Sequence, residues 1–275
     1  MTLKSVSAAL VLALCLASVA FAQFGRGGGR NGRYPPKFAK ADSFGKGFNF
    51  CRGVYTSGHR EPGGQGWSTD YPDAERNFST RLSELTKTRV SMDSRGQPDH
   101  LVVRLTEDAL YQCPYLHMED VGTAVLSDEE VLGLRAFLLK GGFLWVDDYW
   151  GSYAGYNWLD QIARVLPPSE YPVQDLSWDH PIFKTMFEVT SLPQIPSIQF
   201  WRTSRGGTSE RGSDSTTATI QGIADSHGNL IVVMTHNTDI SDAWEREGED
   251  PRFFYKFSPD GYAVGINVIL YALTH

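Results

Sequence analysis

The sequence of 275 residues contains little cysteine, little excess charge and only one long apolar run. Three cysteines exclude a disulfide-dense miniprotein, whose small core needs several bridges. Hydrophobic residues make up 41% of the chain and the formal net charge is −7, which excludes an intrinsically disordered protein. The acidic balance also argues against nucleic acid, so no nucleic-acid partner is expected.

The long apolar run lies near the N-terminus, where it predicts export. Residues 6–19 are apolar, Lys4 precedes them, and the small-x-small sequence Ala20-Phe21-Ala22 follows. This is the pattern of a secretory signal peptide, residues 1–22, with cleavage after Ala22. We therefore expect a periplasmic or secreted protein that retains no membrane span. The mature chain keeps Cys51 and Cys113, for which a disulfide and two buried thiols both remain open.

The next segment, residues 23–43, is rich in glycine and arginine and predicts a flexible tether. A solvated linker is the favoured interpretation, and contact with an anionic envelope surface is the alternative. The folded domain is expected to span residues 44–275.

Within that domain, segments typical of strands and helices alternate. Short apolar runs predict strands at 48–52, 101–103, 115–118 and 143–146. Apolar residues at helical spacing predict helices at 74–85, 131–138, 158–165 and 261–273. Ser127 and Glu130 form a predicted capping box ahead of the second helix, and Gly141 is placed to end it.

Residues 217–224 and 230–235 predict a hairpin, because a turn-forming segment of five residues separates them. The whole pattern predicts an α/β domain with a mostly parallel sheet, helices on both faces and an added β-hairpin.

Several phrases, taken in order, carry a family resemblance. They are GWSTDYP at 66–72, LSDEE at 126–130, GGFLWVDDYWG at 141–151, HPIF at 180–183, HN at 236–237 and GINVILYALTH at 265–275. Over about residues 48–275 the chain resembles the bacterial domain of unknown function 4159 family. The resemblance implies a class I glutamine amidotransferase-like fold with a flavodoxin-like layered α/β core, similar to the trehalose-utilisation-type branch of that group. It also implies an association with cell-envelope systems, which adds an envelope protein as an expected kind of partner. It implies no particular reaction.

The residues argue against glutamine amidotransferase activity. That chemistry needs a cysteine nucleophile between glycines on a sharp strand-to-helix turn, with a histidine to activate it. Neither Cys51 nor Cys113 has this setting, and Asp147-Asp148 stands at the comparable strand end. The sequence also lacks the G-x-S-x-G elbow, the Walker loop and the H-E-x-x-H zinc helix.

Ligands of open α/β sheets bind beyond the carboxyl ends of the strands, so polar residues that follow the predicted strands are the site candidates. The candidate catalytic residues are Asp147, Asp148 and His236, which supply carboxylates and an imidazole for proton transfer. Because side chains alternate along a strand, one of the two aspartates is expected to face the crevice and the other to brace the turn. The candidate ligand-binding residues are Arg52, Tyr55, Trp67, Asp70, Tyr71, Trp150 and Asn237.

A divalent metal is left open by the sequence. Asp147, His236 and His117 would give a mixed carboxylate and imidazole set, which suits zinc, manganese or iron. The acidic segment 239–250 lacks the spacing of an EF-hand and is expected to be a solvated loop.

The leading hypothesis is an exported domain that binds a carbohydrate-like or other small polar envelope ligand at the strand carboxyl ends. The first alternative is a non-catalytic interaction module of a cell-envelope complex, and the second is a metal-dependent hydrolase. Whether the protein is an enzyme stays open.

Overall fold

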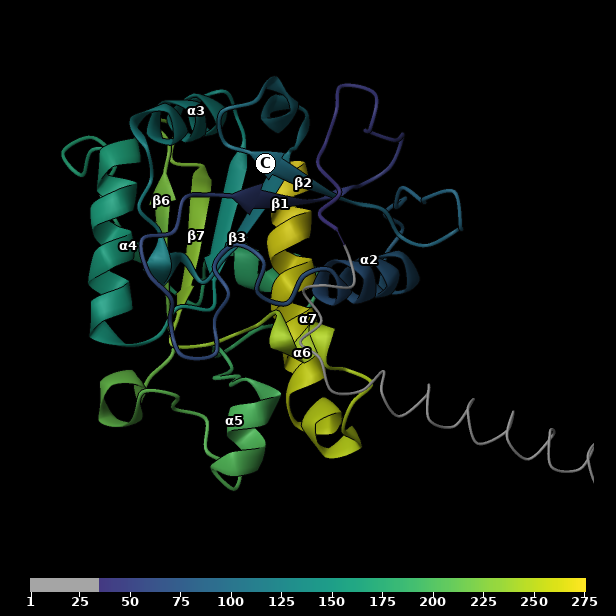
Figure 1. The fold of residues 1–275 in the computed structure, drawn as a ribbon, viewed down its shortest axis with the longest axis vertical. Helices are drawn as coiled ribbons and strands as arrows, with labels where there is room; N and C mark the ends of the chain where they lie inside the picture. The colour runs from purple at the N-terminus through teal and green to yellow at the C-terminus, as the bar shows by residue number, and fades with distance from the viewer. Residues whose placement is uncertain (1–34) are drawn as a thin grey trace, which may run out of the picture. The chain divides into compact units, whose positions relative to one another are not determined.

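The computed structural model describes residues 35–275, and a seven-stranded sheet in the order β2-β1-β3-β4-β7-β6-β5 lies at their centre (Figure 1). The strands are β1 (Phe50–Val54), β2 (His100–Arg104), β3 (Tyr115–Glu119), β4 (Phe143–Asp147), β5 (Gln174–Asp175), β6 (Thr219–Ala224) and β7 (Leu230–His236). Neighbouring strands from β2 to β7 run parallel, whereas β6 and β5 are added antiparallel. This mostly parallel sheet with its hairpin confirms the predicted α/β fold class.

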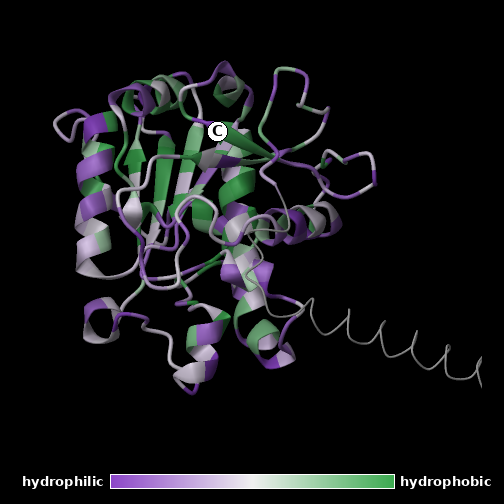
Figure 2. Ribbon diagram, viewed as in Figure 1, coloured by the Kyte–Doolittle hydropathy of each residue, from purple (hydrophilic) through white to green (hydrophobic). Residues whose placement is uncertain are grey.

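Helices cover both faces of the sheet. They are α2 (Asp73–Leu85), α3 (Asp128–Leu139), α4 (Gly151–Val165), α5 (Ile198–Thr203), α6 (Asp242–Glu245) and α7 (Pro251–Thr274). Short 3₁₀ turns lie at Asp108–Gln112, Val121–Thr123, Pro181–Lys184 and Gly212–Ser215. Buried residues of α3 and α4 pack on one face, and those of α2, α6 and α7 pack on the other. Figure 2 shows hydrophobic residues concentrated on the central strands between these layers.

The two cores arise from the alternation of side chains along each buried strand. In β4, Leu144 and Val146 join the core under α3 and α4, while Phe143 and Trp145 join the core under α2 and α7. Asp147 follows Trp145 by two residues, so it belongs to the α2 and α7 face.

The signals at the ends of α3 are confirmed. Ser127 accepts a hydrogen bond from the Glu130 backbone amide, and the Glu130 side chain accepts one from the Ser127 amide. Gly141 lies just beyond the helix with a φ of 94°, a conformation that glycine adopts without strain.

Two helices begin earlier than the sequence predicted. α4 begins at Gly151 rather than after Asn157, because Asn237 and Asp214 accept hydrogen bonds from its first amides. α7 begins at Pro251 rather than at Gly261, with Asp250 as its N-cap and a proline at its first position. The helix continues through Pro259, although proline inside a helix removes one backbone hydrogen bond.

The parallel strands have the doubly wound order 2-1-3-4-5, with β7 as the fifth strand. The connections leave β1 and β3 in opposite directions, which makes the gap beyond their carboxyl ends the expected ligand crevice of this fold. The carboxyl ends of β4 and β7 lie along the same edge. In Figure 1, α5 and α6 lie beyond this end of the sheet.

Cys51 of β1 and Cys113, just before β3, form a disulfide, which settles the alternative that the sequence left open. Residues 37–39 lie along the outer edge of β2, where the Lys37 carbonyl and the Ala39 amide hydrogen-bond to Val102. The predicted signal peptide and tether residues 23–34 lie outside the described residues. Among the residues that are described, no helix is long and apolar enough to cross a membrane.

Candidate functional site

The carboxyl ends of β1 and β3 carry a buried ion-pair network. Arg52 of β1 forms ion pairs with Glu119 of β3, 2.8 Å away, and with Glu75 of α2, and it also donates to the Thr69 carbonyl. All three charged side chains are fully buried. Burial raises the pKa of Glu75 to about 7 despite the attraction of Arg52. Burial alone would also raise the pKa of Glu119, but Arg52 and His117 lower it to about 2. The Arg52 guanidinium therefore pairs with two carboxylates, and its positive charge is already balanced by the protein's own acids.

His117 belongs to the same network. Its Nε2 atom lies 2.8 Å from Glu119 Oε1 and 3.1 Å from Ser241 Oγ, and its Nδ1 atom lies 2.9 Å from the Tyr115 hydroxyl. Burial lowers the pKa of His117, against the opposing effect of Glu119. Since every one of these groups is buried, His117 stabilises the core beneath the sheet edge.

Asp147, at the end of β4, positions the segment that leads to α6. It accepts hydrogen bonds from the Thr235 hydroxyl at 2.6 Å and from the Ile240 and Ser241 amides at 2.7 and 3.2 Å. Burial raises the pKa of Asp147 to about 8, although these hydrogen bonds oppose the shift. Asp147 is thus the predicted brace of the turn rather than the aspartate that faces the crevice.

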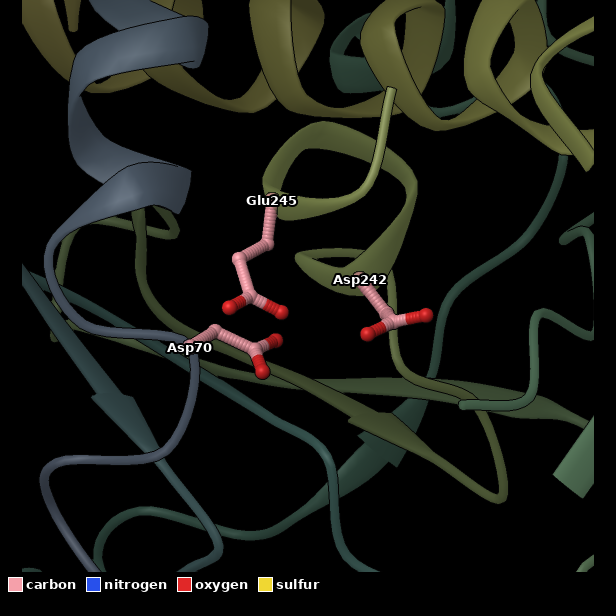
Figure 3. Close-up of side chains that lie close together, drawn as sticks. All are labelled: Asp70, Asp242 and Glu245. Atoms are coloured by element: carbon pink, nitrogen blue, oxygen red, sulfur yellow. The ribbon is translucent and has the colours of Figure 1, made fainter. Parts of the chain in front are cut away.

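The segment held by Asp147 carries two acids of a carboxylate trio. Asp242 and Glu245 lie three residues apart on α6 and therefore share one face of that turn. Asp70 reaches them from the loop before α2, and one oxygen of each side chain lies within 4.8 Å of the other two. Figure 3 shows the Asp70 carboxylate directed toward Glu245, with Asp242 beside them. Two segments about 170 residues apart in the sequence therefore converge here.

Asp70 brings to the trio a buried oxygen that has no hydrogen-bond partner among the described residues. Asp242 Oδ2 accepts from the Ile198 amide at 2.8 Å, and Arg246 forms ion pairs with both Asp242 and Glu245. Asp70 is partly exposed as a residue, yet its Oδ2 atom is buried and has no hydrogen-bond partner among the described residues. Burial and then the nearby Glu245, Glu119 and Asp242 raise the pKa of Asp70 well above its usual value. A buried carboxylate oxygen without a partner, beside two other acids, is costly unless a proton or a cation neutralises the charge.

Two further aspartates surround the trio. Asp239 is buried and accepts a hydrogen bond from the Asp242 amide at 2.7 Å. Asp148 is partly exposed and accepts from Trp150 Nε1 at 2.9 Å. Burial raises the pKa of both groups well above the usual range, and neighbouring carboxylates raise it further. The carboxylates thus form one continuous acidic cluster, composed of Asp70, Glu119, Asp148, Asp239, Asp242 and Glu245.

Non-glycine residues with left-handed backbone gather at this edge. Asp70, Asp120, Asp148 and Asn237 have φ angles of 61°, 51°, 54° and 59°. Aspartate and asparagine tolerate this region better than other residues, but it still costs free energy. Such residues cluster at ligand sites, where the surrounding structure holds side chains in a required direction.

The structure brings some of the predicted site residues to the acidic cluster. Asp70 belongs to the trio, and Asp148 is close enough to interact with it electrostatically. The buried layer beneath is formed by Arg52, His117 and Asp147. Tyr55 donates to the Glu119 and Asp120 carbonyls, and Trp150 holds Asp148. These two aromatic residues therefore position the edge from within the core.

The other predicted residues lie elsewhere. His236 bonds to the Gly151 carbonyl and stacks on Tyr149, on the face of the sheet opposite Asp147. Asn237 accepts from the Gly151 amide and donates to the Thr217 carbonyl, so both residues brace the start of α4. Tyr71 bonds to His100 and packs against Trp67. The structure thus does not bring His236 to Asp147 for joint metal binding.

Sequence reasoning missed Asp242 and Glu245. Segment 239–250 was expected to be a solvated loop, and that expectation is wrong for its first half. Asp239, Asp242 and Glu245 are only 3%, 2% and 7% exposed. The sequence did contain one signal, the large apolar residue Trp244 between Asp242 and Glu245. Its burial in the structure holds both acids on one buried helical turn.

Comparison with known proteins gives a family without a known activity. No curated protein matches the chain. The sequence profile described as "Domain of unknown function (DUF4159)" matches residues 55–273, which include every member of the acidic cluster. The protein therefore belongs to the domain of unknown function 4159 family.

Proposed function

We propose that this protein is an exported domain that binds a divalent cation between Asp70, Asp242 and Glu245, and that a small polar ligand completes the coordination of that cation. The observation that carries this proposal is the buried Asp70 Oδ2 atom, which has no partner among the described residues and lies beside two other carboxylates. A bound cation removes the cost of burying that charge and relieves the repulsion within the trio.

The donor set selects the class of cation. All three groups offer carboxylate oxygens, and the trio contains no imidazole or thiolate. Oxygen-only sites favour the hard cations Ca²⁺, Mn²⁺ and Mg²⁺ over zinc, which prefers nitrogen and sulfur ligands. This ligand set replaces the mixed carboxylate and imidazole set that the sequence suggested.

The position of the trio supports ligand binding rather than a purely structural ion. It lies at the carboxyl edge of a doubly wound sheet, where ligands of such folds bind. Asp70 and Asp148 are partly exposed, so a ligand from solvent can reach this edge.

Export is supported by two independent features. The N-terminal sequence has the pattern of a signal peptide, and Cys51 forms a disulfide with Cys113. Disulfides persist in oxidising compartments such as the periplasm and the extracellular space.

Isothermal titration calorimetry of the mature chain, residues 23–275, with Ca²⁺, Mn²⁺, Mg²⁺ and Zn²⁺ tests the cation site. We expect saturable binding of at least one of the first three, and loss of that binding in Asp70→Asn and Glu245→Gln. Asp160→Asn is the matched control, because Asp160 is exposed on α4. Equal binding to Asp70→Asn and to the native chain would overturn the proposal.

A second candidate function, a metal-dependent hydrolase, is favoured by Asp148. This carboxylate is partly exposed, is held by Trp150 and lies in the electrostatic field of Asp70. A carboxylate beside a bound cation can accept a proton from a cation-bound water. Cation-dependent hydrolysis of a chromogenic ester or glycoside that Asp148→Asn abolishes, while cation binding is retained, would favour this candidate.

A further inference from the structure

We infer that the cation site selects uncharged, hydroxyl-rich ligands and excludes phosphorylated or carboxylated ones, with Asp148 and Asp239 as the residues that set this selectivity. The inference rests on the proposed function, because it concerns the ligand that completes the coordination of the cation. It follows from the charges and from the hydrogen-bonding groups that surround the trio.

Carboxylates outnumber cationic groups around the trio. Asp239 bonds to the Asp242 amide, and both Asp239 and Asp148 lie close enough to Asp70 to share its field. A divalent cation offsets two of these charges and leaves a net negative environment. An anionic ligand that reaches the cation therefore meets fixed like charges at short range, which weakens its binding.

The nearby cationic side chains already have partners. Arg52 is enclosed between Glu75 and Glu119. Arg246 pairs with Asp242, Glu245 and Glu249. Arg211 pairs with Glu61 and Glu210. Anion sites place arginine or lysine in direct contact with the ligand. These three arginines instead form ion pairs with the protein's own acids, so an anionic ligand would have to compete with those acids.

The backbone amides that bind anions in this type of fold are occupied as well. Phosphate groups bind at helix N-termini beyond the strand ends, where amides are unpaired. Here the first two amides of α4 donate to Asn237 and Asp214, and the two amides that precede α6 donate to Asp147. The protein's own side chains thus fill the positions that a phosphate would use.

Asp148 and Asp239, the two further aspartates beside the trio, offer carboxylate oxygens to a ligand. A bound cation opposes the upward pKa shift of Asp148 and Asp239 and favours their ionised forms. Ionised carboxylates are acceptors only, so these two side chains then suit a ligand that presents O–H donors. A hydroxyl group also supplies a neutral oxygen to a hard cation. A polyhydroxylated ligand such as a saccharide meets both requirements, whereas the phosphate group of a phosphate ester brings anionic oxygens that the carboxylates repel.

The test compares neutral saccharides with anionic compounds. The mature protein, saturated with the cation that binds it, is titrated with glucose, N,N′-diacetylchitobiose and cellobiose, and in parallel with glucose 6-phosphate, glucuronate and inorganic phosphate. We expect at least one neutral saccharide to bind about ten-fold more tightly than the charged compounds, since one fixed charge at partial screening has an effect of about this size.

Variants locate the selectivity. Asp148→Asn should reduce the preference for the neutral saccharide over its charged counterpart about ten-fold, since it removes one fixed negative charge, whereas the control Asp160→Asn should not change it. Equal or tighter binding of glucose 6-phosphate or phosphate by the cation-loaded native protein would overturn the inference. So would the absence of binding by every neutral saccharide.

Failure of the inference and failure of the proposed function give different results. If the cation does not bind, or binds equally to Asp70→Asn, the proposed function fails before any saccharide is added. If the cation binds through Asp70 and the charged ligands are preferred, only the inference fails. Binding of an alkylamine such as putrescine in the presence of a chelator would also contradict the inference, because the carboxylates would then hold an ammonium group directly.

Discussion

Asp70→Asn should make the cation-free protein more stable and at the same time abolish its stabilisation by a cation. Asparagine keeps the shape of aspartate and tolerates the φ of 61° at this position, so the substitution changes charge without adding backbone strain. It removes a buried carboxylate oxygen that lacks a hydrogen-bond partner among the described residues.

The expected magnitudes have opposite signs in the two conditions. In a chelator at mildly alkaline pH, relief of the unpartnered charge should stabilise the variant by about 1–2 kcal/mol, which for a domain of this size raises Tm by about 2–8 °C. With cation at a hundred times its Kd, the native protein should gain about 2.7 kcal/mol, and the variant should gain nothing measurable.

Differential scanning calorimetry of the native chain, Asp70→Asn and the control Asp160→Asn, each with chelator and with Ca²⁺ or Mn²⁺, measures both effects. The reasoning would be refuted if Asp70→Asn were less stable than the native protein in chelator and still gained stability from the cation. That result would mean that Asp70 supports the fold rather than a ligand.

Three further predictions concern Asn237, Gly265 and His100. Asn237→Ala should destabilise the protein by about 2–3 kcal/mol in urea unfolding, because it removes the hydrogen bonds to Gly151 and Thr217 and places alanine at a φ of 59°. The Kd for the cation should stay unchanged, and a large rise in that Kd would make Asn237 part of the site. Gly265→Ala should lower the free energy of unfolding by about 1–3 kcal/mol, because the added Cβ would lie 2.3 Å from Trp244 of α6. Since α6 carries Asp242 and Glu245, the same change should weaken cation binding in calorimetry. Native-like stability would show that α6 can shift without cost. Burial lowers the pKa of His100 to about 4 in the folded protein, below its value in the unfolded chain. The unfolded chain therefore takes up a proton first as the pH falls, so the free energy of unfolding is unaffected above about pH 6.5 and decreases by up to about 3 kcal/mol toward pH 4. His100→Gln should flatten the unfolding free energy over that pH range, and an unchanged pH profile would contradict the assignment.

The sequence predicted the fold well because its strongest signals are local. Continuous apolar runs such as 143–146 indicated buried parallel strands, and the capping box at Ser127 indicated the start of α3. The early starts of α4 and α7 were missed because Gly151, Pro259 and Gly261 suggest breaks. In both helices, contacts with distant side chains and a good N-cap outweigh the local propensity.

The site could be predicted only in part, because its members come from distant segments. Asp70 and Asp148 were found from their positions in loops after predicted strands. Asp242 and Glu245 were not, since a run of acids resembles a solvated loop until Asp147 and α2 are known to enclose it. The separation of His236 from Asp147 does follow from alternation once β4 and β7 are known to be neighbours, because Asp147 lies beside Thr235 and His236 points to the opposite face.

The most direct test of the central claim is a crystal structure of the mature protein grown with Mn²⁺ and measured for anomalous scattering. We expect an anomalous peak between Asp70, Asp242 and Glu245, at about 2.0–2.6 Å from one oxygen of each. A well-ordered trio without such a peak, in crystals grown at saturating Mn²⁺, would contradict the account. So would a peak that Asp70→Asn leaves in place.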